Sequence, residues 1–167
     1  MGDKRHTHVG IAQYAISSDV DETLVASSLG SCLGMAIFDP VGRHAGMIHC
    51  LVPLKGPDRE KAEQQPAFFV ESGVPMILEA LLKRGAQKKD LIIVLAGCAQ
   101  INADHSIFEI GKKNLTICKK ILWKNSLLIK AEHCGGDFSR TLAMDVGSGR
   151  VTVKSQGVVE EVSEARV

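Results

Sequence analysis

Two short apolar runs in the first half of the chain are separated by a turn sequence. The runs Leu33–Phe38 and Ala45–Val52 flank Asp39-Pro40-Val41-Gly42, whose proline and glycine are typical of turns. Each run has the length of a strand rather than that of a helix. The pattern therefore predicts a β-hairpin at this point of the chain.

The segments on either side of this hairpin are expected to be extended or irregular. Val9–Ile16 is apolar on both faces and predicts a buried strand, and Thr23–Ala26 predicts a short extended approach to the hairpin. The charged residues 1–8 are expected to form a loosely ordered arm. Pro53–Gln65 combines prolines, a glycine and charges, which predicts a surface loop.

Two later segments have the apolar periodicity of amphipathic helices. The first begins at Pro66 and ends at Gly85, and its apolar stripe is formed by Phe69, Gly73, Met76, Ile77, Ala80 and Leu81. The second is Asn114–Asn125, with Leu115, Cys118, Ile121 and Leu122 on one face. We therefore expect two long helices.

The remaining apolar runs predict strands, and most of them lie toward the C-terminus. Those expected are Leu91–Ala96, Leu127–Glu132, and a hairpin of Thr141–Asp145 and Arg150–Lys154 around Val146-Gly147-Ser148-Gly149. Ala103–Ile110 is expected to be a loop, and residues 156–167 an edge strand or a loosely ordered tail. About seven or eight strands in hairpin-like groups favour an α+β or layered fold over a doubly wound sheet.

Composition narrows the class of protein. The 167 residues fit one domain, 1–167, and a formal charge of +1 gives no reason to expect nucleic acid or lipid as a partner. The first residues do not resemble a secretory signal, and no apolar run approaches the roughly 20 residues of a membrane span. Five cysteines without a Cys-x-x-Cys spacing argue against a disulfide framework or a zinc ribbon. We expect a cytoplasmic protein with reduced thiols and without a metal or organic cofactor.

The candidate chemistry is a thiol and an imidazole on neighbouring strands. Leu29-Gly30-Ser31 delivers Cys32 to the start of the first strand of the hairpin, and the second strand carries His49. An imidazole partner would lower the pKa of the thiol and act as a general acid and base. The small residues Gly30 and Ser31 would leave backbone N–H groups free to hold an oxyanion.

The other cysteines and histidines are weaker candidates. Cys50, Cys98, Cys118 and Cys134 are expected to be small buried hydrophobes. His6 and His8 lack a third ligand nearby, so a metal site there is not predicted. Redox sensing by Cys32 together with Cys50 or Cys98 stays open as an alternative.

Several short motifs in series resemble those of the CheD family, the chemoreceptor glutamine deamidases. They are Leu29-Gly30-Ser31-Cys32, Phe38-Asp39-Pro40, Gly46-Met47-Ile48-His49, Leu51-Val52-Pro53, Ala96-Gly97-Cys98-Ala99, Phe108-Glu109-Ile110-Gly111-Lys112-Lys113-Asn114 and Gly135-Gly136-Asp137-Phe138-Ser139-Arg140. The likeness runs in order from about Val9 to Lys154.

The resemblance implies a layered α/β/β sandwich of mixed strands related to the bacterial deamidating toxins. It implies Cys32 as the nucleophile and His49 as its base. The family has a threonine just before Leu-Gly-Ser-Cys, where this chain has Ala26 and Ser27, and Ser27 is the hydroxyl that we assign to that role. Gly97, Gly135, Gly136 and Arg140 are expected to line the site or face the substrate.

The function implied by the resemblance is deamidation of receptor glutamines. The substrate would be the cytoplasmic helical domain of a chemotaxis receptor, and the loop Pro53–Gln65 is a candidate for contacts with it. The alternative is a regulatory binding partner of a CheC-type chemotaxis phosphatase, with little or no deamidase activity.

Overall fold

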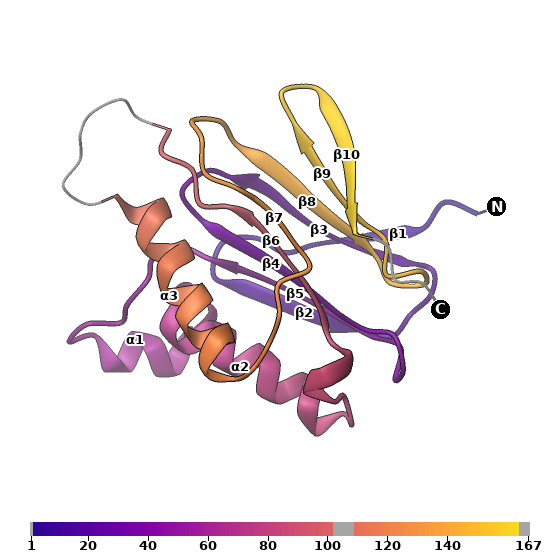
Figure 1. Ribbon diagram of the computed structural model, residues 1–167, viewed down its shortest axis with the longest axis horizontal. Coiled ribbons are helices and arrows are strands. Elements are labelled where there is room, and N and C mark those ends of the chain that lie inside the picture. Colours follow the sequence, from indigo (N-terminus) through magenta and orange to yellow (C-terminus); the bar gives the residue numbers. More distant parts are fainter. Residues whose placement is uncertain (1, 102–108, 164–167) are drawn as a thin grey trace.

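The computed structural model describes residues 2–101 and 109–163, and ten strands in these ranges form two sheets (Figure 1). One sheet has the order β1-β3-β8-β9-β10, with strands Arg5–His8, Glu22–Leu29, Arg140–Asp145, Val151–Ser155 and Val158–Ser163. The other has the order β2-β5-β4-β6-β7, with strands Gln13–Ser17, His44–Cys50, Leu33–Asp39, Ile92–Gly97 and Ala131–Cys134.

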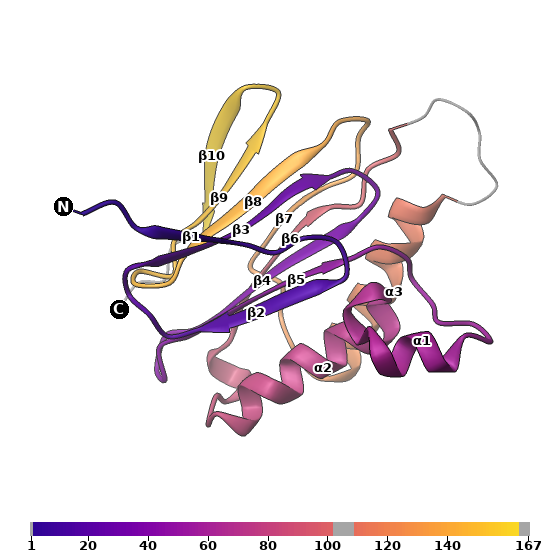
Figure 2. The same ribbon diagram turned by 180° about the vertical axis from the view of Figure 1, so that it is seen from behind.

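The helices gather on one side of the strands in both ribbon views (Figures 1 and 2). They are α1 (Arg59–Gln64), α2 (Val70–Lys83) and α3 (Ile110–Lys124), with short 3₁₀ turns η1 (Pro66–Phe68) and η2 (Lys88–Asp90). Leu33, Met35, Ile37, Ile48 and Cys50 of the second sheet pack against apolar residues of α2 and α3. The burial of these faces holds the helices on the sheet.

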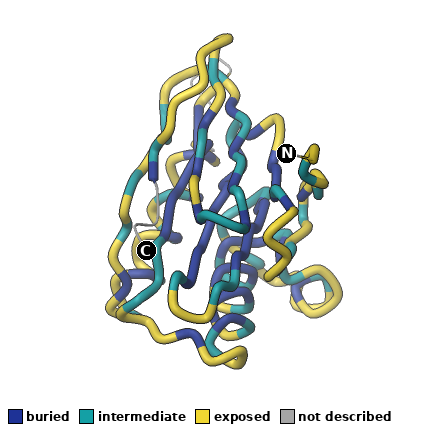
Figure 3. Tube along the Cα trace, turned by 90° about the vertical axis from the view of Figure 1, so that its right-hand side faces the viewer, coloured by how far each residue is buried: buried dark blue, intermediate teal, exposed yellow. Residues whose placement is uncertain are grey.

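The opposite face of the second sheet packs against the first sheet. Ala36, Phe38, Ala45 and Met47 lie in one buried cluster with residues of β3, β8 and β9. Alternate residues of a strand point to opposite faces, so β4 and β5 contribute to both cores. Residues of β4 and β5 are almost all buried, and Figure 3 shows buried segments in the interior of the molecule with exposed segments around them. The fold is therefore mixed α/β, with two sheets and few helices.

The two predicted hairpins are confirmed. In the first, β4 and β5 pair antiparallel from Leu33↔Cys50 to Asp39↔His44. In the second, β8 pairs with β9. The strand Leu91–Ala96 is confirmed as β6, and the two long helices are confirmed as α2 and α3. Their starts differ from the prediction: Pro66 begins the 3₁₀ turn η1 while α2 begins at Val70, and α3 begins at Ile110 rather than at Asn114.

Several boundaries differ from the sequence prediction. The arm is not loosely ordered throughout, because Arg5–His8 forms β1 and pairs in parallel with β3. The predicted buried strand Val9–Ile16 is instead the partly exposed edge strand β2, which begins at Gln13. The surface loop contains α1, whose N-cap Asp58 accepts a hydrogen bond from the Lys61 N–H.

The C-terminal half also needs correction. The strand predicted at Leu127–Glu132 is β7, Ala131–Cys134, and it starts later because residues 126–130 lead out of α3. Of the tail 156–167, Val158–Ser163 forms the edge strand β10, and residues 164–167 lie outside the described part of the chain. In the predicted loop Ala103–Ile110, residues 103–108 lie outside it as well.

Candidate active site

Cys32 lies in the turn between β3 and β4, and backbone hydrogen bonds fix this turn. The Cys32 carbonyl accepts a hydrogen bond from the Cys98 N–H at 2.8 Å, and the Gly30 carbonyl accepts one from the Ala99 N–H at 2.8 Å. The segment that follows β6 therefore holds the turn from one side. Cys32 is 5% exposed.

A cavity of about 630 Å³ opens beside Cys32. Its walls come from four segments: the β3–β4 turn, the residues after β6, the first turns of α3, and the Gly135-Gly136 turn. Cys32 and Cys98 lie in its wall, and Lys112 and Glu109 line it from the side of α3. No residue of the predicted contact loop 53–65 is among its described lining residues.

His49 lies on β5, on the face of the strand that points toward the first sheet. Its Nδ1 is 3.1 Å from the Val9 carbonyl oxygen. A carbonyl can only accept, so Nδ1 carries the proton, and Nε2 of the neutral ring is left as an acceptor. Nε2 is buried and has no hydrogen-bond partner among the described residues. The ring is therefore oriented as a base with its acceptor nitrogen unoccupied.

Cys32 and His49 share the intersheet face of the second sheet. His49 pairs with Gly34, two residues after Cys32, so the two side chains are diagonal cross-strand neighbours. No hydrogen bond joins them among the described contacts. Burial raises the pKa of the Cys32 thiol and lowers the pKa of His49. The direction is therefore opposite to the predicted lowering of the thiol pKa by the imidazole, and burial favours the neutral form of both groups.

The structure does not bring Ser27 to His49. Ala26 is fully buried in the intersheet cluster, whereas Ser27 is exposed. Among the described residues no hydrogen bond links Ser27 to the imidazole, and the Val9 carbonyl takes the orienting position on Nδ1. Sequence reasoning missed Val9, because nothing in its local pattern indicates a contact with a residue 40 positions away.

The predicted glycines and Arg140 divide into two groups. Gly135 and Gly136 line the cavity as expected, whereas Gly97 and Arg140 are not among its lining residues. The Arg140 guanidinium is buried and donates to the carbonyls of Gly97, Gly135 and Phe138, the shortest at 2.6 Å to Gly135. Arg140 therefore holds the cavity wall rather than facing a substrate.

Asn114 of α3 is a second residue that sequence reasoning missed. Its side chain is fully buried, and Nδ2 donates to the carbonyls of Ser31 at 2.9 Å and of Leu51 at 3.1 Å. Ser31 precedes Cys32, and Leu51 is two residues after His49. Asn114 therefore ties the thiol turn to the end of the histidine strand.

The other four cysteines lie in different environments. Cys50 belongs to the helix-side cluster, on the opposite face from Cys32, so these two thiols are not brought together. Cys98 is hydrogen-bonded to Cys134, which lowers the pKa of the Cys134 thiol. Burial raises the pKa of Cys118 to about 12. Among the described residues no three His, Cys, Asp or Glu side chains gather as a metal site requires.

Comparison with known proteins adds the family. A family model described as CheD chemotactic sensory transduction matches residues 51–155. A probable chemoreceptor glutamine deamidase CheD 1 from Syntrophus aciditrophicus is 38% identical over 149 residues, covering 89% of this chain and 93% of that protein. Its counterpart from Solibacter usitatus is 34% identical over 154 residues, covering 92% and 91%. The chain belongs to the CheD family.

The CheD family model begins after His49, while the alignments with these relatives extend over most of the chain. Among solved structures, the hypothetical protein YfiH of Bacillus licheniformis is 12% identical, with a TM-score of 0.44 over 72% of this chain and 49% of that one. Within residues 2–101 and 109–163 of this CheD family member, no helix has both the length and the apolar character that crossing a membrane requires.

Proposed function

We propose that this chain hydrolyses the side-chain amide of glutamines in a chemotaxis receptor, with Cys32 as nucleophile and His49 as base. One observation carries the proposal: Cys32 lines a cavity, and His49 shares its sheet face with an unpartnered, buried Nε2. The names of the similar proteins supply the substrate class, a chemoreceptor glutamine.

In the first half of the reaction, the Cys32 sulfur attacks the side-chain carbonyl carbon as the S–H proton moves to His49 Nε2. His49 then gives this proton to the leaving nitrogen, the C–N bond breaks, ammonia departs, and a thioester remains. In the second half, water attacks the thioester while His49 takes its proton, and the proton returns to sulfur as glutamate leaves. Dividing one high barrier into two lower ones is the advantage of the covalent route.

The neutral state of the pair suits this sequence of steps. A thiol with a raised pKa needs a base in contact with it during attack, and a histidine with a lowered pKa is free of its proton to serve as that base. The backbone N–H groups of Ser31 and Cys32 are the oxyanion donors in this proposal, since the Gly30 N–H already donates to the Ser28 carbonyl.

The proposal also includes a fold relation and a cellular compartment. We assign the layered α/β/β sandwich of the bacterial deamidating toxins, which the packing of the helices on one sheet and of the two sheets on each other supports. The receptor substrate is a cytoplasmic helical domain, so this chain acts in the cytoplasm. Ser27 would contribute only through rearrangement, because its side chain is exposed at rest.

Ammonia release from a purified receptor cytoplasmic fragment tests the proposal. We expect the wild-type protein to release ammonia with conversion of glutamine to glutamate, and Cys32→Ala to release none above background. A Cys32→Ala protein with full activity would refute the assignment of the nucleophile.

A second candidate function is regulatory binding to a CheC-type phosphatase with little deamidation. The exposure of Ser27 favours it, because Ala26 has no hydroxyl group and Ser27 makes no hydrogen bond to His49 among the described contacts. This function predicts that the protein binds and stimulates such a phosphatase and leaves receptor glutamines intact. Receptor deamidation at normal rates by the same preparation would exclude it as the main role.

A further inference from the structure

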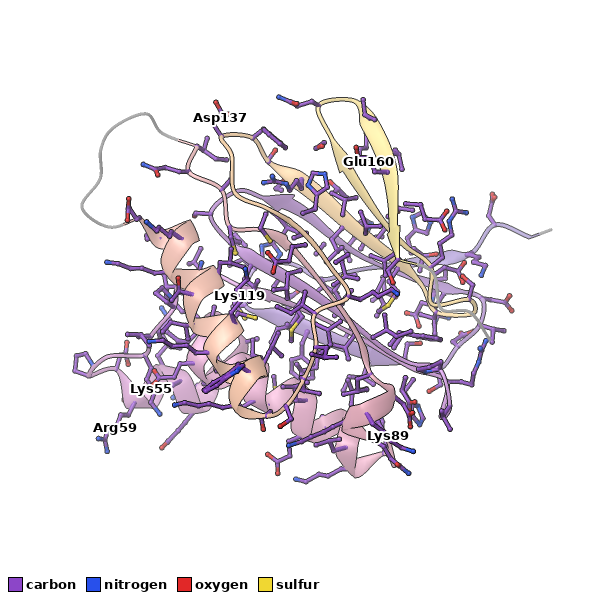
Figure 4. All side chains as sticks on the ribbon, viewed as in Figure 1. Lys55, Arg59, Lys89, Lys119, Asp137 and Glu160 are labelled. Carbon is purple, nitrogen blue, oxygen red and sulfur yellow. The ribbon has the colours of Figure 1, made fainter. Side chains whose placement is uncertain are left out.

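The outer face of α3 carries only basic and neutral residues. Its five lysines are Lys112, Lys113, Lys119, Lys120 and Lys124, and the sequence of the helix contains no acidic residue. At 100° per residue these lysines and Trp123 fall within one arc, with Lys112, Lys119 and Trp123 nearly in line. We call these six residues the α3 lysine face. Figure 4 labels Lys119, in the middle of the helix.

Trp123 is the unusual member of this face. Its side chain is 80% exposed, and it is the single tryptophan of the chain. Leu128, shortly after the helix, is 87% exposed. A large exposed aromatic residue among positive charges is a common anchor of protein interfaces, where tryptophan is strongly enriched. The helix does not need this ring for its own packing, because Asn114, Cys118 and Leu122 form the buried side.

Most of the positive charge on this face is not neutralised. Lys119 pairs with Glu132 at 2.9 Å, and Lys112 lies 3.9 Å from Glu109. Among the described residues Lys113, Lys120 and Lys124 have no carboxylate partner within ion-pair distance. An acidic partner would therefore meet three uncompensated ammonium groups around an apolar ring.

The α3 lysine face is continuous with the cavity. Lys112, at the start of the face, lines the cavity that holds Cys32, as do Ile110 and Gly111. The helix has 15 residues and so runs about 22 Å away from the cavity, at 1.5 Å per residue. A rod-like ligand that inserts one side chain beside Cys32 can lie along this face toward Trp123.

We propose that the α3 lysine face is a docking surface for an acidic, helical segment of the protein substrate, and that it selects glutamines flanked by carboxylates on one helix face. The inference rests on the proposed function for the identity of the reacting side chain. The lysines lie along α3, with Lys112 and Lys119 seven residues apart and Lys120 and Lys124 four apart. Carboxylates three, four or seven residues apart on a substrate helix also share one face, so they can lie opposite these lysines.

A protein partner fits this surface better than a nucleic acid or a membrane. The basic residues form one helix-width stripe that ends at a cavity for a single side chain, and the whole chain carries a formal charge of only +1. A polyanion would use broader positive surface, and it would have no group for the cavity.

The fluorescence of Trp123 tests the docking surface directly, because no other tryptophan contributes. The probe is an alanine-based peptide of about 20 residues, long enough to form helix in water, with one glutamine near its end and glutamates along one face. Cys32→Ala protein is used so that the glutamine is not consumed. We expect a saturable blue shift of the emission, and a Kd raised at least about tenfold in Lys120→Glu/Lys124→Glu, since each reversal replaces an attraction by a repulsion.

The matched control changes the same charge elsewhere. Lys89→Glu/Lys154→Glu reverses two exposed lysines outside α3, on η2 and β9, and is expected to keep the Kd within twofold. A peptide with serines in place of the glutamates is expected to bind at least tenfold more weakly. Equal weakening by both double variants, equal binding of the serine peptide, or an unchanged emission at saturating acidic peptide would overturn the proposal.

Two further measurements distinguish the docking surface from the proposed deamidase function and from binding of lipid or DNA. With active protein, Lys120→Glu/Lys124→Glu should raise KM for the acidic peptide and leave kcat unchanged; binding without any deamidation would contradict the proposed function and leave the docking surface intact. A blue shift with phosphatidylglycerol vesicles or duplex DNA, but none with the acidic peptide, would overturn the proposal in favour of those partners.

Discussion

In the proposed function, Cys32 and His49 enter the reaction as a neutral thiol and a neutral imidazole, and this has a measurable consequence. Burial holds the Cys32 pKa above its ordinary value and the His49 pKa below it. An imidazolium–thiolate pair would keep the thiol reactive at acid pH. In a Cys134→Ser background, we instead expect the rate of Cys32 alkylation by iodoacetamide to be low at pH 7 and to rise only above about pH 8.5, the ordinary thiol pKa.

The lowered pKa of His49 also determines how kcat/KM should change with pH. His49 must be deprotonated to accept the thiol proton, and its lowered pKa means that kcat/KM should fall only below about pH 6.5, the ordinary histidine pKa. Rapid alkylation that persists at acid pH and disappears in His49→Ala would contradict the neutral pair. The Cys134→Ser change matters because the lowered pKa of Cys134 makes it a competing thiol.

Asn114 is expected to position Cys32 rather than to bind substrate. Asn114→Ala leaves the Ser31 and Leu51 carbonyls without its Nδ2 donor, which costs about 1–3 kcal/mol when such groups stay buried. Because the thiol turn loosens against the histidine strand, we predict a drop in kcat of about tenfold or more with little change in KM. Steady-state kinetics of ammonia release measures both.

The control for this prediction is another asparagine of the same helix region. Asn125 donates to the Ile121 carbonyl within its own helix, so Asn125→Ala should leave kcat unchanged. Equal losses in the two variants would mean that Asn114 acts through helix stability alone.

At the residue scale the sequence indicates the proposed reacting groups, Cys32 and His49, through a small-residue turn and an adjacent strand. It does not indicate the residues that hold them in place. Asn114 bonds to residues 83 and 63 positions away, and Val9 to a residue 40 positions away. Such contacts depend on how the elements are arranged in space, which no local pattern specifies.

Among the elements, the end of β6 passes close to the thiol turn at Gly97. Gly97 has φ +96°, and a Cβ built there would lie 2.3 Å from the Cys32 carbonyl oxygen. Gly97→Ala must therefore push the turn away, on top of the backbone strain. We expect a loss of about 3 kcal/mol in the free energy of unfolding, with a fall in Tm of roughly 6–12 °C, measured by thermal denaturation.

Gly85 provides the matched control for that substitution. It has φ +97° at the end of α2, and nothing lies within 4 Å of a Cβ built there. Gly85→Ala should therefore show only the backbone cost of a side chain at positive φ, about 1–2 kcal/mol. If the two variants lost equal stability, the close approach of Gly97 to Cys32 would have no energetic weight.

The elements that sequence patterns predict well are those with a strong apolar period. The β4–β5 hairpin, β6 and both long helices bury whole faces, so their patterns are clear. The strands β1 and β10 are largely exposed edge strands without a continuous apolar face. They are hard to predict because their extended conformation depends on pairing with β3 and β9, which are neighbouring strands of the same sheet. The short helix α1 buries only Ala62, so it left no stripe to detect.

Over the whole molecule, the two faces of the second sheet have different neighbours. Its face toward the first sheet carries Cys32 and His49, and its other face holds the helices in place. The helix α3 connects the two, because Asn114 reaches the thiol turn while the lysines point outward. In the proposed function, the reacting pair and the distal lysines of α3 therefore lie in different layers. Substitutions at Lys120 and Lys124, which do not line the cavity, should change KM without changing the reactivity of Cys32.

The most direct test of the account is the mass of the covalent intermediate. Protein mixed with a glutamine peptide is quenched in acid, digested, and analysed for a peptide joined through a thioester with loss of ammonia. The account predicts this adduct on the fragment that contains Cys32, together with deamidated product, and neither in Cys32→Ala. Deamidation at the full rate in Cys32→Ala, or an adduct on another cysteine such as Cys134, would contradict it.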